Sequence, residues 1–330
     1  MSMLDSIALM MINLPLSNNK RNPYTVMSIL FPLLSSVCWT FTALFFATAS
    51  KASGPLVVNA TRLVVASVLL WGFALIVAAV NGQSAIFWGS PSLLWLMLSA
   101  FSGLIAGDFL YLKSLSSLGP RRTTQLLTIS PIATVIISRI LFNETVALKS
   151  LIGIVVVVVG LILAVMNERK DSEKKHREPG TFSYMGYALC AMAAIFHGAG
   201  ASLVRKAFLV DTSIDPLVAA AFRISSAALM SIVWMVLAVN IMEIVKTNPA
   251  RKSSHVQIPF FAATLLGPVV GMIFYITALK TSPAGIVAAL SSLSPIMIIP
   301  VTSILYKHIP GVLSIIGTVV AVVGVVVISL

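Results

Sequence analysis

A few polar side chains stand inside long apolar segments of this sequence, and any chemistry must depend on them. Asp108 lies about sixteen residues into one such segment. An ionised carboxylate is costly in apolar surroundings unless it is paired, so an acid at this place needs a function or a structural partner. Asp108 could therefore bind a proton or a cation, or it could form a structural salt bridge or hydrogen bond.

Basic and aromatic residues occur in similar surroundings. Arg62 and Arg223 lie within about two turns of the end of an apolar segment, so their long side chains are expected to anchor at a membrane surface, with a charge-binding or gating role as the alternative. Trp39 and His197 lie near the middle of two apolar segments, at related points of the chain. They could line a binding cavity, or they could be a packing Trp and a satisfied core His.

Other kinds of chemistry lack their residue patterns. Cys38 and Cys190 show no spacing that could hold a metal, and no HExxH, Gly-x-Ser-x-Gly or paired-Asp pattern occurs. We therefore expect no metal site, no cofactor and no enzyme. A phosphate-binding Gly-rich loop and a filter-like segment typical of channels are also missing, which argues against ATP-driven transport and against a channel.

Composition places these residues in a membrane protein. Of the 330 residues, 58% are hydrophobic and only 10% are charged, whereas a soluble domain has about 45–50% and about 25%. The net charge of +12 comes mostly from Lys and Arg between apolar segments. Such residues are typical of loops that face anionic lipid, so we expect no nucleic-acid partner.

The elements that must position the candidate residues are membrane-spanning helices. A span needs about 20 mostly apolar residues, and polar interruptions divide the chain into ten. The predicted spans are 25–49, 55–80, 92–117, 122–142, 147–166, 182–204, 216–241, 257–279, 284–306 and 309–329. The predicted parts of the chain are an N-terminal tail (1–24), a first five-helix unit (25–166), a charged linker (167–181) and a second five-helix unit (182–330).

The two units repeat one another. Aligning 103–166 with 267–330 without a gap gives 18 identities in 64 pairs, including Gly103/Gly267, Gly107/Gly271, Tyr111/Tyr275 and Pro131/Pro295. Upstream the offset becomes 161 and pairs Arg62 with Arg223. Small residues four apart let helices approach closely, so the paired glycines are expected to mark helix contacts. Pro131 and Pro295 could serve as hinges or as static kinks.

An odd number of spans per unit fixes the relative orientation of the two units. Because five crossings bring the chain out on the opposite side, consecutive copies must lie upside down relative to each other. The predicted fold is thus an all-α integral membrane protein with ten transmembrane helices in two inverted five-helix repeats. This architecture is common in secondary transporters, whose substrate site lies near the midplane between the repeats.

The residues also carry a family resemblance. The stretch "GDFLYLKSLSSLGPRRTTQLLTISPIATVIISRILFNE" and its partner "GMIFYITALKTSPAGIVAALSSLSPIMIIPVTSILYKH" resemble the two EamA domains of the drug/metabolite transporter superfamily. The resemblance implies roles for Tyr111 and Tyr275 and for the acid that ends the fourth helix, Glu144. The sequence departs from the family pattern at His308, where that acid is usually repeated.

Together these features predict a secondary-active transporter of a small metabolite, which works by alternating access in the plasma membrane. Basic residues outnumber acidic ones near the predicted core, which favours an amino acid or an organic anion. Two alternatives stay open: a proton-coupled exporter of cationic drugs, in which only Asp108 could carry the proton, and a non-transporting scaffold or receptor. A homodimer is also an open alternative.

The orientation of the termini is open as well. Carriers of this type are usually described with both termini in the cytoplasm, and that arrangement would place most basic residues of the linker outside. The positive-inside rule favours the opposite arrangement, with both termini outside.

Overall fold

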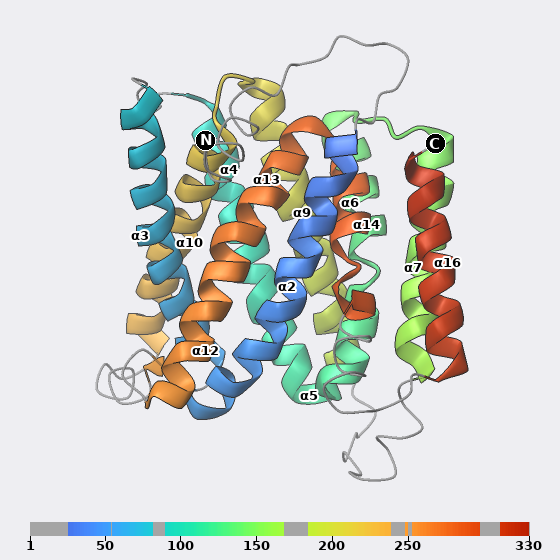
Figure 1. The fold of residues 1–330 in the computed structure, drawn as a ribbon, viewed down its shortest axis with the longest axis horizontal. Helices are drawn as coiled ribbons and strands as arrows, with labels where there is room; N and C mark the ends of the chain where they lie inside the picture. The colour runs from blue at the N-terminus through green and yellow to red at the C-terminus, as the bar shows by residue number, and fades with distance from the viewer. Residues whose placement is uncertain are drawn as a thin grey trace, which may run out of the picture.

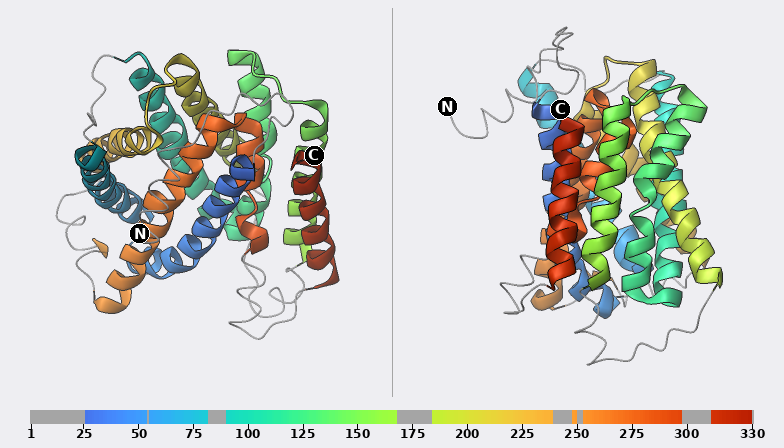
Figure 2. Two further views of the ribbon diagram at one scale, coloured as in Figure 1. Left: turned by 45° about the horizontal axis from the view of Figure 1, so that its top comes forward. Right: turned by 90° about the vertical axis from the view of Figure 1, so that its right-hand side faces the viewer.

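The computed structural model describes residues 26–53, 55–81, 90–167, 184–238, 248–249, 253–297 and 311–329. The described chain is helical and contains no strand. Its helices pack side by side in one bundle, shown in Figure 1 and from two further sides in Figure 2. The first repeat contributes α2 (Val26–Ser53), α3 (Pro55–Asn81), α4 (Ser92–Ser99), η1 (Ala100–Gly107), α5 (Asp108–Leu127), α6 (Ser130–Phe142) and α7 (Leu148–Asn167). The second contributes α9 (Tyr184–Val210), α10 (Pro216–Ala238), α12 (Ser254–Thr264), η3 (Leu265–Gly271), α13 (Met272–Thr281), α14 (Ala284–Ser291) and α16 (Val312–Ser329).

The number of apolar helical segments confirms the predicted ten spans. Within the described residues, six helices are long and apolar enough to cross a membrane, and four shorter apolar helices of 10–17 residues accompany them. The shorter four are Met27–Thr42, Ser130–Phe142, Leu148–Ala164 and Ala284–Met297. Many large apolar side chains point outward from these helices, for example Val80 and Leu237. A surface of this kind is stable against lipid chains, so the chain is a multi-pass membrane protein.

The third span of each repeat contains a stretch of π-helix. η1 ends at Gly107 and η3 ends at Gly271, and these two glycines are equivalent positions, 164 residues apart. A π-helical turn accommodates an extra residue and often marks a functional site. As a result, Asp108 and its equivalent Met272 both directly follow a π-helical segment.

One predicted boundary is wrong. The sequence suggested a break between the third and fourth spans at Gly119–Arg122, but α5 continues through it to Leu127. The chain then turns at Thr128–Ile129, directly before the Ser-Pro pair that begins α6. The second copy has the equivalent turn at Ser292–Leu293, with the same backbone bonds: Ile132 N to Ile129 O and Ile296 N to Leu293 O.

The first helix of each repeat packs into the other repeat. α2 lies against α12, η3, α13 and α14, and α9 lies against α4, η1, α5 and α6. α3 and α10, the second helices of the two repeats, pack together at one edge of the bundle, while α7 and α16, the fifth helices, pack together at the opposite edge (Figure 1). Each copy therefore depends on the other for its packing, and the third spans with their π-helical segments lie between the copies.

The contacts between α7 and α16 confirm the inverted arrangement. Gly153 lies against Gly324, and Gly160 lies against Ala321 and Gly317. Residue numbers rise along α7 while they fall along α16, so these equivalent helices run antiparallel. That is the geometry that two five-helix copies of opposite orientation require.

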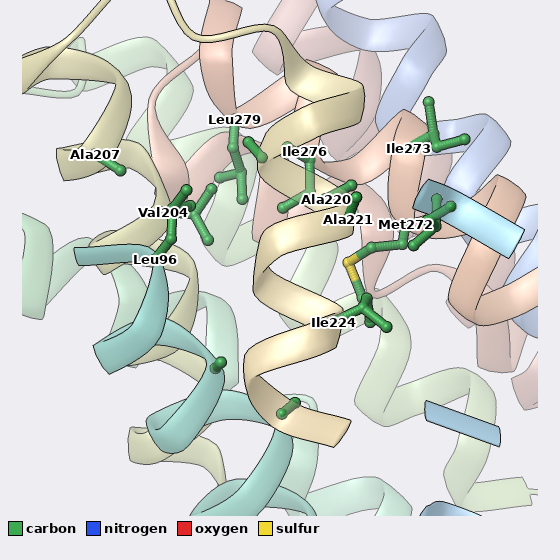
Figure 3. Packing of buried hydrophobic residues seen from close by; sticks show 14 of the residues in the cluster. Leu96, Val204, Ala207, Ala220, Ala221, Ile224, Met272, Ile273, Ile276 and Leu279 are labelled. Carbon is green, nitrogen blue, oxygen red and sulfur yellow. The ribbon is translucent and has the colours of Figure 1, made fainter. Parts of the chain in front are cut away.

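The core that surrounds the third spans is apolar and built from small and branched side chains. It joins α4, α9, α10 and α13, and Figure 3 shows its centre. In that view the side chain of Met272 extends from α13 toward α10, the helix that carries Ala221 and Ile224. Small residues on α10, such as Ala220 and Ala221, are fully buried and let the neighbouring helices approach.

Candidate functional site

Asp108 is the centre of a charged cluster formed by three helices from both repeats. Its Oδ2 lies 3.0 Å from Nη2 of Arg62 on α3, and its Oδ1 lies 3.3 Å from Nε2 of His197 on α9. The structure thus brings together three residues that the sequence analysis had selected separately. A salt bridge, which was one of the two interpretations of Asp108, is present.

Arg62 is held in place on both sides. Its Nε donates a hydrogen bond to Oδ1 of Asn59 at 2.8 Å, and its Nη2 donates to Asp108 at 3.0 Å. The expectation that Arg62 anchors at the membrane surface is therefore wrong: its guanidinium turns inward, where Asp108 compensates its charge. Charge-assisted bonds of this kind fix direction as well as distance.

Arg223 differs even more from the expected surface anchor, because it is only 4% exposed. Its Nε donates a hydrogen bond to Oγ of Ser99 at 2.6 Å, and its Nη1 lies 3.2 Å from Sδ of Met272. Within the described residues it forms no ion pair. The anchoring prediction failed because α10 turns this side chain toward α4 and α13 and away from the lipid.

Trp39 and Tyr275 form the aromatic part of the site. Their ring centroids are 5.1 Å apart and the rings are inclined by 52°. Trp39 lies on α2 and Tyr275 on α13, so this pair also joins the two repeats. Tyr275 is close enough to Arg223 to interact with it electrostatically.

Trp39 and His197 occupy equivalent places, each against a glycine of the opposite repeat. A Cβ on Gly107 would collide with the His197 ring, and a Cβ on Gly271 would lie 3.1 Å from Nε1 of Trp39. Four residues earlier, the equivalent glycines also contact the first helix of the opposite repeat: Gly103 faces Gly200, and Gly267 faces Thr42. The paired glycines therefore mark close helix contacts, as predicted, and each π-helical segment supports one ring from the opposite repeat.

The remaining candidates lie around this centre. Tyr111 follows Asp108 by three residues, on the same face of α5. Pro131 stands in the first turn of α6, where a missing N–H is tolerated. Pro295 lies in a helical stretch just after the turn at Ser292–Leu293. The chain breaks its helix before each proline, and a hinge function at these turns stays a prediction.

Glu144 joins the ends of three helices at some distance from Asp108. Its Oε1 accepts a hydrogen bond from Nε of Arg205 at 2.8 Å, and its Oε2 accepts one from the backbone N of Ala284 at 3.1 Å. Arg205 also donates to the carbonyls of Leu279 and Lys280. This cluster ties the end of α6 to α9 and to the connection between α13 and α14. His308, the equivalent of Glu144, lies outside the described residues.

The arrangement around Asp108 can recognise charge, but it does not suggest bond chemistry. Two guanidinium groups and one imidazole accompany a single carboxylate, so the site has an excess of positive charge. Nε2 of His197 is buried and makes no aligned hydrogen bond with any described residue. Across the described chain, no group of three His, Cys, Asp or Glu side chains could hold a metal.

Sequence reasoning missed several members of the site. Ser99 and Met272 contact Arg223, and Asn59 orients Arg62, yet none of the three is unusual in its own segment. The repeat alignment held a signal for Met272, because it paired this residue with Asp108. Ser99 and Asn59 gave no such signal, since only the packing of helices shows that they are close.

Comparison with known proteins agrees with this architecture. The family model described as "EamA-like transporter family" matches the chain twice, over residues 26–166 and 184–330. A solved structure described as "Crystal structure of protein" is similar in fold, with a TM-score of 0.66 and 19% identity, over 91% of this chain and 95% of that one. No curated protein sequence matches the chain significantly.

Proposed function

Because this chain belongs to the EamA-like transporter family, we propose that it is a secondary-active carrier of a small amino acid or organic anion. The carrier works by alternating access: the two inverted repeats rearrange about a site between them, which opens to either side of the membrane in turn. The proposed site comprises Asp108, Arg62, His197, Arg223 and the Trp39–Tyr275 pair, with Tyr111 beside it. The proposed location is the plasma membrane.

The excess of positive charge at the site is the observation that supports a substrate with a negatively charged group. Arg62 and Arg223 both carry a cationic guanidinium, and Asp108 forms an ion pair with only one of them. A substrate that brings a negative group lowers the electrostatic cost of this arrangement, whereas a cation adds to it. Export of cationic drugs is less favoured, because Asp108 is already engaged by Arg62 and lies next to His197.

Counterflow in proteoliposomes tests the proposal. Vesicles are loaded with an unlabelled pool of amino acids, organic anions or organic cations, and entry of the labelled counterparts is followed without any ion gradient. We expect transient accumulation with the amino-acid or organic-anion pool, since exchange through a carrier needs only the substrate on both sides. Accumulation with the cation pool alone would contradict the proposed substrate class. No accumulation with any pool, from folded protein, would favour a scaffold or receptor.

A further inference from the structure

The two repeats differ at one pair of positions where their chemistry should match. Arg62 and Arg223 are equivalent, 161 residues apart, and Asp108 and Met272 are equivalent, 164 residues apart. In the first copy Arg62 contacts Asp108 at 3.0 Å, and in the second copy Arg223 contacts Met272 at 3.2 Å. The same two helix positions therefore meet in both copies, but only the first copy supplies a carboxylate.

The guanidinium of Arg223 is buried without a carboxylate partner among the described residues, which is energetically unfavourable. A thioether is a weak acceptor without charge, and Arg223 remains protonated wherever it is placed. Its other hydrogen bond goes to the neutral hydroxyl of Ser99. A buried charge that has only neutral partners is retained at a cost in stability, which a purely structural role at this position would not require.

These contacts use only Nε and Nη1 of Arg223 as hydrogen-bond donors. Its Nη2 lies where a Cβ on Gly103 would be only 2.9 Å away, and it makes no hydrogen bond with any other part of the described chain. Gly103 thus makes room for the guanidinium, because a side chain at this position would collide with Nη2. Asp108 is close enough to attract Arg223 electrostatically but forms its ion pair with Arg62.

We propose that Arg223 is the anion-binding residue of this carrier, and that the carboxylate of the substrate gives Arg223 the counter-charge that Asp108 gives Arg62. The inference rests on the proposed function and assigns the substrate's charged group to one residue. A single guanidinium with one hydroxyl neighbour suits a monoanionic carboxylate. The neighbouring Trp39–Tyr275 pair and the apolar side chains of α10 and α13 suit an apolar body (Figure 3).

Met272→Asp supplies the missing carboxylate from the protein itself and is the central variant of the test. By the equivalence with Arg62 and Asp108, the new side chain should pair with Arg223 and exclude a ligand carboxylate. Met272→Leu is the matched control, because it keeps an apolar side chain of similar size. Arg223→Met removes the charge altogether and serves as a second, independent variant.

The measurement is the thermal stability of the purified full chain in detergent, titrated with carboxylates at constant ionic strength. The probes are L-leucine, lactate and benzoate, each compared with its own amide, and sodium chloride. We expect at least one carboxylate, but not its amide, to stabilise the wild type and Met272→Leu. In Met272→Asp and Arg223→Met, half-saturation should need about thirtyfold more of that carboxylate, or the response should be lost. Response to L-leucine alone would indicate an amino acid, and response to lactate or benzoate an organic anion.

Two results would overturn the inference. The first is an unchanged response in Met272→Asp, and the second is equal stabilisation by chloride and carboxylates. If carboxylate counterflow is normal in Met272→Asp, the role of Arg223 is wrong but the proposed carrier function stands. If the wild type binds carboxylates, but not their amides, and shows no counterflow, the role of Arg223 stands and the carrier function is wrong.

Discussion

Asp108→Asn is expected to lower the rate of transport by about a hundredfold without unfolding the protein. The carboxylate joins Arg62 and His197, so it links α3, α5 and α9 across the two repeats. The amide has the same size but no charge, and it leaves Arg62 without a counterion beside the second guanidinium. The side chains of Arg62 and Asp108 are 23% and 18% exposed, so the uncompensated charge is partly shielded from the lipid by protein and partly solvated. We expect it to raise the barrier to transport by about 2.7 kcal/mol, which corresponds to the hundredfold loss of rate.

The measurement is the initial rate of counterflow, with equal amounts of folded protein in the vesicles. Arg62→Gln combined with Asp108→Asn is the informative control, because it removes both charges. Partial recovery in the double variant would show that the loss comes from the stranded guanidinium. A single variant that transports at the wild-type rate would remove Asp108 from the site. Uptake driven by an imposed pH gradient is measured separately: if Asp108→Asn keeps the wild-type dependence on that gradient, Asp108 is not the proton carrier.

Gly160→Leu is expected to have the largest effect on stability. A Cβ at Gly160 would collide with the backbone of Ala321, and it would lie 2.7 Å from the carbonyl oxygen of Gly317. Because these contacts are to backbone, the leucine can be accommodated only if α7 and α16 move apart. We expect a loss of about 3 kcal/mol or more, since overpacking costs about 1–3 kcal/mol even where side chains can adjust.

Thermal unfolding in detergent and the monodispersity of the purified protein measure this effect. Gly72→Leu is the matched control, because nothing lies within 4 Å of a Cβ at Gly72. The control should behave like the wild type. Equal stability of the two variants would mean that α7 and α16 do not pack through their glycines.

The repeat could be detected from the sequence because the residues that match between the two copies are ones that helix packing constrains. Gly107 and Gly271 must stay small where a ring from the opposite repeat lies against them. The turns at Thr128–Ile129 and Ser292–Leu293 precede Ser-Pro pairs in both copies. Such residues keep their register through duplication, so the alignment revealed two copies. The polar interruptions had already divided each copy into five spans, and the inverted architecture followed.

What the sequence could not predict depends on partners in space. The exchange of α2 and α9 between the repeats has no signature within either helix, because lipid-facing and core-facing surfaces are both apolar. The sequence predicted that Arg62 and Arg223 anchor at the membrane surface, because it shows how far along a span a residue lies. It does not show the direction in which the side chain points. The π-helical segments, which end at Gly107 and Gly271, were not predicted from the apolar pattern.

In the proposed mechanism, the site between the repeats opens to both sides of the membrane. The reactivity of a cysteine introduced at Met272 tests this most directly. Cys38 and Cys190 are first replaced by serine, and Met272→Cys is then introduced. A negatively charged, membrane-impermeant thiosulfonate reagent is applied to proteoliposomes from outside, or trapped inside. The control is Leu229→Cys, at a position on α10 that is 66% exposed on the apolar surface.

We predict that the cysteine at 272 reacts from both sides, that a transported carboxylate protects it, and that the cysteine at 229 does not react. Reaction from one side only, whatever substrate is present, would contradict alternating access at this site.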